Sequence, residues 1–140
     1  MKKPDKGLII LAESDKYQII DITSKRPLFR VDLDQTRMNL VEYFGLTHAI
    51  SYSIQSGFKI DIYTNSRTAL DWVYDRKADF TEFSGNRSGL IKRLNDRSTQ
   101  LLKSYDIARI SSEELIINAT VGVFRWDENS WGKISNDYGI

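Results

Sequence analysis

The sequence predicts an α/β domain built on a mixed β-sheet. Near the N-terminus, three short runs of β-favouring residues follow one another with short polar turns between them, a pattern typical of an antiparallel meander. Residues 37–57 then show the apolar spacing of an amphipathic helix, and a strand-like run at 58–64 follows. A strand–helix–strand connection of this length normally pairs its strands in parallel. The sheet should therefore contain both kinds of pairing.

The first three strands are expected at residues 7–13, 17–22 and 28–33. Residues 7–13 are a nearly continuous apolar run, whereas residues 28–33 alternate apolar and polar side chains with the period of a half-exposed strand. Pro27 belongs to the loop before the third strand, because proline has no N–H to donate to a sheet.

The central helix is predicted to begin near Arg37 and to end at Gly57, a residue type that commonly follows a helix C-terminus. Apolar side chains recur along it every three or four residues, so one face should be buried. After the strand at 58–64, Ser66 can cap a second helix.

The second half of the chain has less regular patterns. Residues 76–89 are polar and contain glycine, which predicts a loop, and residues 90–105 have the spacing of a third helix. Residues 107–114 are expected to be irregular. Residues 115–125 are rich in β-favouring types and are predicted to be one last strand before a polar, aromatic tail. These assignments give a five-stranded sheet with helices on both faces.

Length and composition limit the classes of protein that the chain can represent. One hundred and forty residues suit a single domain spanning residues 1–140, and a net charge of +1 gives no global basic field for nucleic acid. There is no cysteine, which excludes disulfides and thiolate metal sites. The apolar run Leu8–Ala12 is too short for a signal-peptide core or a membrane span, so we expect a cytoplasmic protein with no membrane partner.

Two segments resemble parts of a known family. The first is NLVEYFGLTHAISYSIQSGFKIDIYTNSRTALDWV, at residues 39–73, and the second is the C-terminal FRWDENSWGKISNDYGI. They resemble a bacterial branch of ribonuclease H-like proteins. That branch has a long helix with a glutamate in an N-x-x-E-[FY] context and a strand that ends in Y-[ST]-D-S-x-T-A-x-x-W-V. A tryptophan-glycine pair near its C-terminus precedes alanine-aspartate-phenylalanine-glycine. The resemblance implies a ribonuclease H fold, with three antiparallel strands followed by parallel ones.

The resemblance also implies a set of metal-binding carboxylates that is incomplete here. In the family, carboxylates hold two Mg²⁺ ions that promote phosphodiester cleavage. Glu42 matches the helix glutamate and Asp137 the closing aspartate, but Asn65 stands where the strand-end aspartate belongs. The first-strand aspartate falls at Ala12, or at Glu13 if the strand slips by one residue. Because an amide supplies a neutral oxygen, we expect catalysis to be lost or strongly impaired.

Three functions follow as alternatives. The first is an inactive ribonuclease H-like domain that binds nucleic acid or a protein partner. The second is an active enzyme that cleaves the RNA strand of RNA–DNA hybrids, with Mg²⁺ or Mn²⁺ held by Glu42, Asp137 and either Glu13 or Asp15. The third is a protein-interaction module without a nucleic-acid role.

Each candidate residue also has a purely structural interpretation. Glu42 can be a surface carboxylate on the flank of a helix, Asp137 a turn residue, and Asn65 the end of a strand before the Ser66 cap. Phosphate contacts are expected from four cations, because helices flanking this region contact the hybrid in the family: Arg87, Lys92, Arg93 and Arg97. Asp96 dilutes this patch, so a solvated helix face is the alternative.

Overall fold

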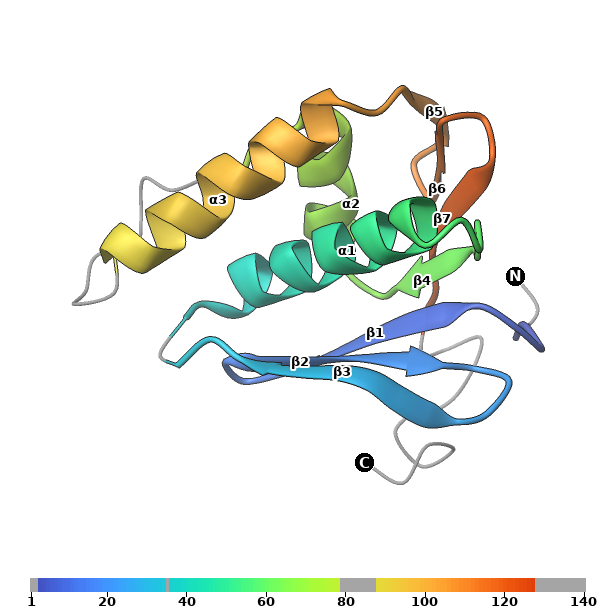
Figure 1. Cartoon of the computed structure of the whole chain (residues 1–140), viewed down its shortest axis with the longest axis horizontal. Helices are drawn as coiled ribbons and strands as arrows, with labels where there is room; N and C mark the ends of the chain where they lie inside the picture. The colour runs from blue at the N-terminus through green and yellow to red at the C-terminus, as the bar shows by residue number, and fades with distance from the viewer. Residues whose placement is uncertain (1–2, 35, 79–87, 128–140) are drawn as a thin grey trace.

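The computed structural model describes residues 3–34, 36–78 and 88–127. Within this part of the chain there are one seven-stranded mixed sheet and three helices (Figure 1). In chain order the elements are β1 (Leu8–Glu13), β2 (Lys16–Asp21), β3 (Arg26–Asp32), α1 (Met38–Gln55), β4 (Ile62–Thr64), α2 (Arg67–Asp75), α3 (Ser88–Lys103), β5 (Ile107–Ser111), β6 (Glu114–Ile117) and β7 (Val121–Arg125).

The sheet combines antiparallel and parallel pairing, as predicted. Its strand order is β3-β2-β1-β4-β7-β6-β5. The strands β1, β2 and β3 form the expected antiparallel meander, while β4 pairs in parallel with both β1 and β7. The carboxyl ends of β1, β4 and β7 therefore lie at the same edge of the sheet, which is where side chains following these strands can meet.

The prediction of five strands is wrong, because the C-terminal part of the sheet contains a hairpin that the sequence pattern conceals. Residues 107–114 were expected to be irregular but contain β5 and the first residue of β6. The single strand expected at 115–125 is two strands, separated by a turn at Asn118 and Ala119. Both turn residues have a left-handed backbone, with φ of 51° and 57°. Asparagine tolerates this conformation, but alanine gives no such signal.

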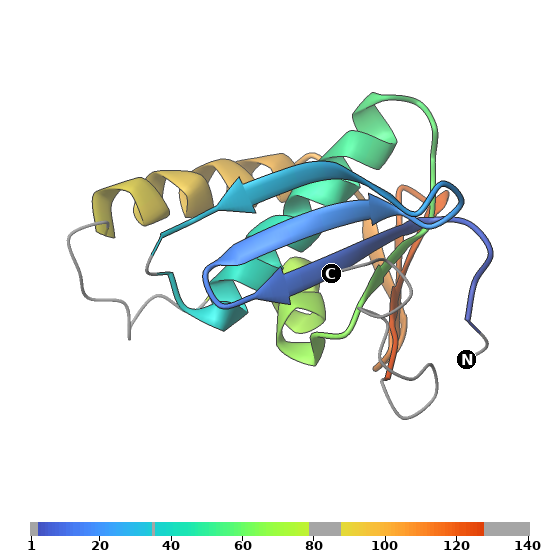
Figure 2. The same ribbon diagram turned by 90° about the horizontal axis from the view of Figure 1, so that it is seen from below.

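The expectation of helices on both faces is also wrong for the described residues. The three helices lie on the same face of the sheet, as both views show (Figures 1 and 2). Leu8 and Ile10 of β1 share one large hydrophobic core with apolar side chains from all three helices. Ile9 points to the opposite face, where it joins a smaller cluster that includes Tyr63 and Trp126. None of the described helices is long and apolar enough to cross a membrane.

Helix α1 lies close against the sheet and organises the core. It ends at Gln55, and Gly57 follows in the left-handed conformation with φ of 78°, as the sequence predicted. Midway along the helix, a Cβ atom added to Gly45 would lie 3.0 Å from Ile10 and 3.1 Å from Tyr17. The absence of a side chain at this position therefore lets α1 approach β1 and β2.

The turn between β6 and β7 offers a direct test of this hairpin. We expect Ala119→Gly to stabilise the protein by about 0.5–1 kcal/mol, because the left-handed conformation is costly for alanine and not for glycine. The matched control is Ala108→Gly at an exposed position of β5 that pairs with Ile116, which should destabilise, since glycine weakens a strand. Urea denaturation of the three proteins measures both changes. If Ala119→Gly destabilises the protein, residue 119 does not have the left-handed backbone assigned to this turn.

Candidate site at the carboxyl ends of the parallel strands

The residues that follow the three parallel strands lie side by side at one edge of the sheet. Leu8 and Ile9 of β1 pair with Ile62 and Tyr63 of β4, which sets the ends of these two strands close together. On the other side of β4, the backbone N–H of Trp126 donates to the carbonyl of Thr64 at 2.8 Å. Asn65 and Ser66 consequently lie between the end of β1 and the end of β7.

Glu42 reaches this edge from α1. Its carboxylate lies near the Ser66 side chain, and the Ser66 hydroxyl accepts a hydrogen bond from the backbone N–H of Ala69 at 3.0 Å. Ser66 is thus the predicted N-cap of α2 and also the contact between α2 and α1. Burial raises the pKa of Glu42 above its ordinary value, and the Ser66 hydrogen bond offsets part of that rise.

The two candidate positions on β1 lie on different faces of the sheet. Ala12 is partly buried against the core beneath the helices, in phase with Leu8 and Ile10. Glu13 is exposed, and strand alternation assigns it to the opposite face. Asp15, the other acid considered for the first strand, lies in the turn between β1 and β2. The β1 position that faces the helix carrying Glu42 therefore holds an alanine.

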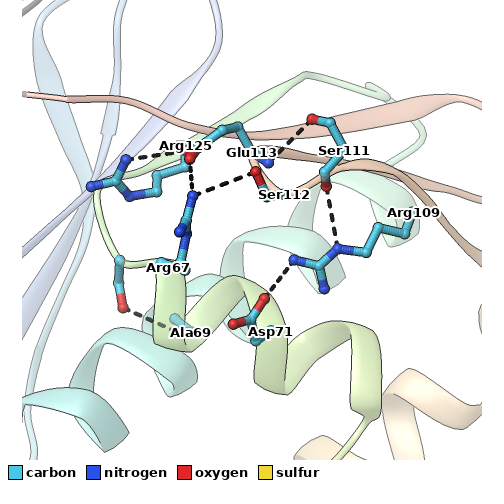
Figure 3. Close-up of polar contacts among 9 residues, drawn as sticks. Arg67, Ala69, Asp71, Arg109, Ser111, Ser112, Glu113 and Arg125 are labelled. Atoms are coloured by element: carbon cyan, nitrogen blue, oxygen red, sulfur yellow. Dashed lines mark hydrogen bonds and ion pairs between the residues drawn. The ribbon is translucent and has the colours of Figure 1, made fainter.

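Asn65 is exposed directly after β4, and its neighbourhood is basic. Two arginines close to this strand end pair with one carboxylate: Arg67 at the start of α2 and Arg125 at the end of β7 both contact Glu113 (Figure 3). The Arg125 Nη1 atom lies 3.1 Å from Glu113 Oε2, and Arg67 also donates to the Ser112 hydroxyl at 3.4 Å.

The pKa of Glu113 reflects these two guanidinium groups. Desolvation acts to raise the pKa, but hydrogen bonds from Arg125 and Arg67, together with their charges, outweigh it and hold the value below the ordinary one. Glu113 is therefore ionised at neutral pH. The cluster has two positive charges and one negative charge, and the Arg67 side chain is 54% exposed. It is suited to holding an incoming anion such as a phosphate.

The donor atoms described at this edge do not fit a pair of Mg²⁺ ions. Two such ions need several charged oxygen ligands that converge. Within residues 3–34, 36–78 and 88–127, no three His, Cys, Asp or Glu side chains gather in a way that could hold a metal. Of the predicted metal-binding positions, Glu42 and the amide Asn65 lie near the end of β4. Asp137 lies outside the described residues.

The predicted phosphate-binding cations belong to a different surface. Lys92, Arg93 and Arg97 are exposed on α3, which packs on α1, while Arg87 lies outside the described residues. The sequence prediction missed Arg67, Glu113 and Arg125, since no local pattern links positions so far apart. It treated Ser66 as a cap but had no signal for its contact with Glu42, which depends on helix packing. No protein-family model matches the chain.

Substituting Glu42 tests the cost of keeping this carboxylate buried. Because its folded-state pKa is raised, the folded protein binds more protons than the unfolded one, and stability decreases as the pH rises through that pKa. Glu42→Gln should remove this loss and raise the unfolding midpoint at pH 7.5 by about 1–4 °C. The gain should disappear well below the ordinary glutamate pKa, where Glu42 is neutral in both states.

Thermal unfolding between pH 3 and pH 8 measures this difference. The control is Asp96→Asn, which removes an exposed carboxylate on α3 and should change the midpoint little at any pH. A Glu42→Gln protein that is less stable than the parent at pH 7.5 would show that the carboxylate is stabilising, contrary to the pKa direction.

Proposed function

We propose that this chain is a ribonuclease H-like domain in which metal-dependent cleavage is lost or strongly impaired, and that it acts by binding nucleic acid. The observation that carries the proposal is the position of Glu42 on α1 near Ser66, the residue that directly follows Asn65. The helix glutamate thus lies near the end of β4, and Asn65 supplies an amide at the position where the resemblance implies a carboxylate.

The strand order supports the fold part of this proposal. The run β3-β2-β1-β4-β7 has three antiparallel strands followed by two that are parallel to β1, with α1 leading into β4 and α2 following it. The order and pairing of these five strands support the ribonuclease H-like fold that we propose. The strands β6 and β5 then extend the sheet beyond β7, so they add to that arrangement without interrupting it.

The charges at the strand ends support the loss of cleavage. Carboxylates offset the charge of two dications, whereas Ala12 and Asn65 contribute none. Arg67 follows Asn65 by two residues, and Arg125 ends the adjacent strand, so positive charge lies near the place where the ions would bind. Like charges at close range repel, which further disfavours a metal pair here.

Exposed cations favour a role in binding. Arg67 lies at the strand-end site, and Lys92, Arg93 and Arg97 lie along α3. Guanidinium and ammonium groups bind phosphates and release counterions when they do so. With a net charge of only +1 for the whole chain, such binding would depend on these local groups and would be sensitive to salt.

A protein-interaction module is the second candidate, because β5 lies at one edge of the sheet formed by the described residues and carries an exposed isoleucine. The strand β5 is the last in the sheet order, and Ile110 on it is 57% exposed. An unpaired strand edge presents backbone N–H and C=O groups to which an extended segment of another protein can add. Contacts of this kind depend weakly on salt, which separates the two candidates.

A hydrolysis assay tests the loss of cleavage. The purified chain is incubated with a labelled RNA–DNA hybrid and Mg²⁺ or Mn²⁺, with Glu42→Gln as the control for trace contaminating nuclease. We expect no cleavage above that of the Glu42→Gln protein, because the metal-binding carboxylates are incomplete. Clear cleavage that Glu42→Gln abolishes would overturn the proposal in favour of an active metal-dependent ribonuclease H.

Fluorescence anisotropy tests binding to the same hybrid without added metal. Replacing Lys92, Arg93 and Arg97 together with glutamine should weaken binding at least tenfold and make the dependence of log K on log salt less steep by about 1–3. The charge-matched control replaces Lys16, Lys25 and Arg26 with glutamine; these exposed residues lie at the β2–β3 hairpin. Binding without salt dependence, or no binding, would contradict the nucleic-acid role and favour a protein partner.

A further inference from the structure

A second concave region lies on the other side of α1 from Glu42. It is a groove of about 680 Å³ between α1, α3 and the strands β2 and β3. Figure 1 shows α3 lying above α1, with β2 and β3 on the side of the sheet away from β4. Ligand sites commonly have volumes of about 300–1,000 Å³, so this groove is large enough for a small molecule.

The groove has apolar walls and one charged side chain. Leu33 and Phe44 are buried at its base, and Leu94 and Leu101 of α3 form part of the opposite wall. Arg97 stands among its lining residues, exposed to solvent, and makes no ion pair with any residue in the described part of the chain. None of the described lining residues is acidic. The groove therefore offers apolar contact together with a net positive charge.

A buried hydrogen bond gives the groove a second polar group of defined character. The Tyr17 hydroxyl lies 2.8 Å from Nδ1 of His48, and both residues line the groove. Burial raises the pKa of Tyr17 to about 12 and lowers that of His48, so both are neutral at pH 7.

The direction of this hydrogen bond follows from the partners that the described residues provide. His48 Nδ1 is the one acceptor found there for the buried Tyr17 hydroxyl proton. If Tyr17 donates to Nδ1, the imidazole proton must be on Nε2. In that tautomer the Nε2–H group is a hydrogen-bond donor without a partner among the described residues, on a side chain that lines the groove.

We propose that this groove binds a small monoanionic ligand with an apolar body, that is, an aromatic or short aliphatic carboxylate. The apolar body would pack against Phe44, Leu94 and Leu101, and the carboxylate would pair with Arg97 and accept a hydrogen bond from His48 Nε2–H. One cation in an apolar groove matches one negative charge, whereas a nucleic-acid backbone requires several cations along its path.

This inference does not depend on the nucleic-acid proposal, because the two sites are built from opposite sides of α1. Glu42 contacts Ser66 at the start of α2, whereas His48 contacts Tyr17 of β2. Arg97 is the one residue that both proposals use. Binding to the groove can therefore be measured separately, with a carboxylate ligand that contains no phosphate.

The test compares two probes that share an apolar body and differ in charge. The unmodified chain, labelled with ¹⁵N, is titrated with 4-phenylbutyrate and separately with 4-phenylbutylamine, and backbone resonances are followed by NMR. We expect the carboxylate to shift groove resonances, such as those of Ser51 and Leu101, and to bind at least tenfold more tightly than the amine. Equal binding of the two probes, or shifts confined to other surfaces, would overturn the proposal.

Two further measurements identify the groups responsible. Arg97→Gln should weaken 4-phenylbutyrate binding about tenfold, because it removes the charge-assisted contact, whereas Lys103→Gln on the same helix should not. Long-range ¹H–¹⁵N spectra of His48 should show the proton on Nε2. Unchanged affinity after Arg97→Gln, or a proton on Nδ1, would contradict the assignment. Displacement of the carboxylate by an RNA–DNA hybrid would assign the groove to nucleic acid instead.

Discussion

The close approach of α1 to the sheet at Gly45 is the constraint on which the rest of the structure depends. With no side chain at this position, the helix comes near enough to Ile10 and Tyr17 for its two flanks to reach different elements. On one flank, Glu42 meets Ser66 at the end of β4; on the other, His48 meets Tyr17. A bulkier residue at Gly45 would move both contacts together, since they lie on the same rigid helix.

The strand-end edge contains charged groups of both signs in two different environments. Glu42 is half-buried on the helix side near the neutral Ser66 hydroxyl, whereas Arg67 and Arg125 surround Glu113 on the side of β7. Because its pKa is raised, the Glu42 carboxylate lowers the stability of the folded protein at neutral pH. The N-cap of α2 is formed by Ser66 and Ala69 and does not include Glu42.

The two proposed sites are similar in construction but differ in the number of charges around them. Both rely on a helix that presents a polar side chain to an adjacent element. At the strand ends two arginines surround one carboxylate and Arg67 is exposed, which suits the phosphate of an extended polyanion. In the groove, one exposed guanidinium adjoins a mainly apolar wall, which suits a compact ligand with a single charge.

Local signals in the sequence determined a large part of the architecture. The runs that became β1, β2 and β3, the helix that ends before Gly57, and the Ser66 cap all follow from the conformational preferences of neighbouring residues. Tertiary structure alone decided the rest. Ala119 adopts a left-handed turn because the strands on either side pair with each other, and Glu42 meets Ser66 because α1 and α2 pack. Contacts between distant residues depend on how faces are buried, and a periodic pattern shows which face is apolar but not what it will pack against.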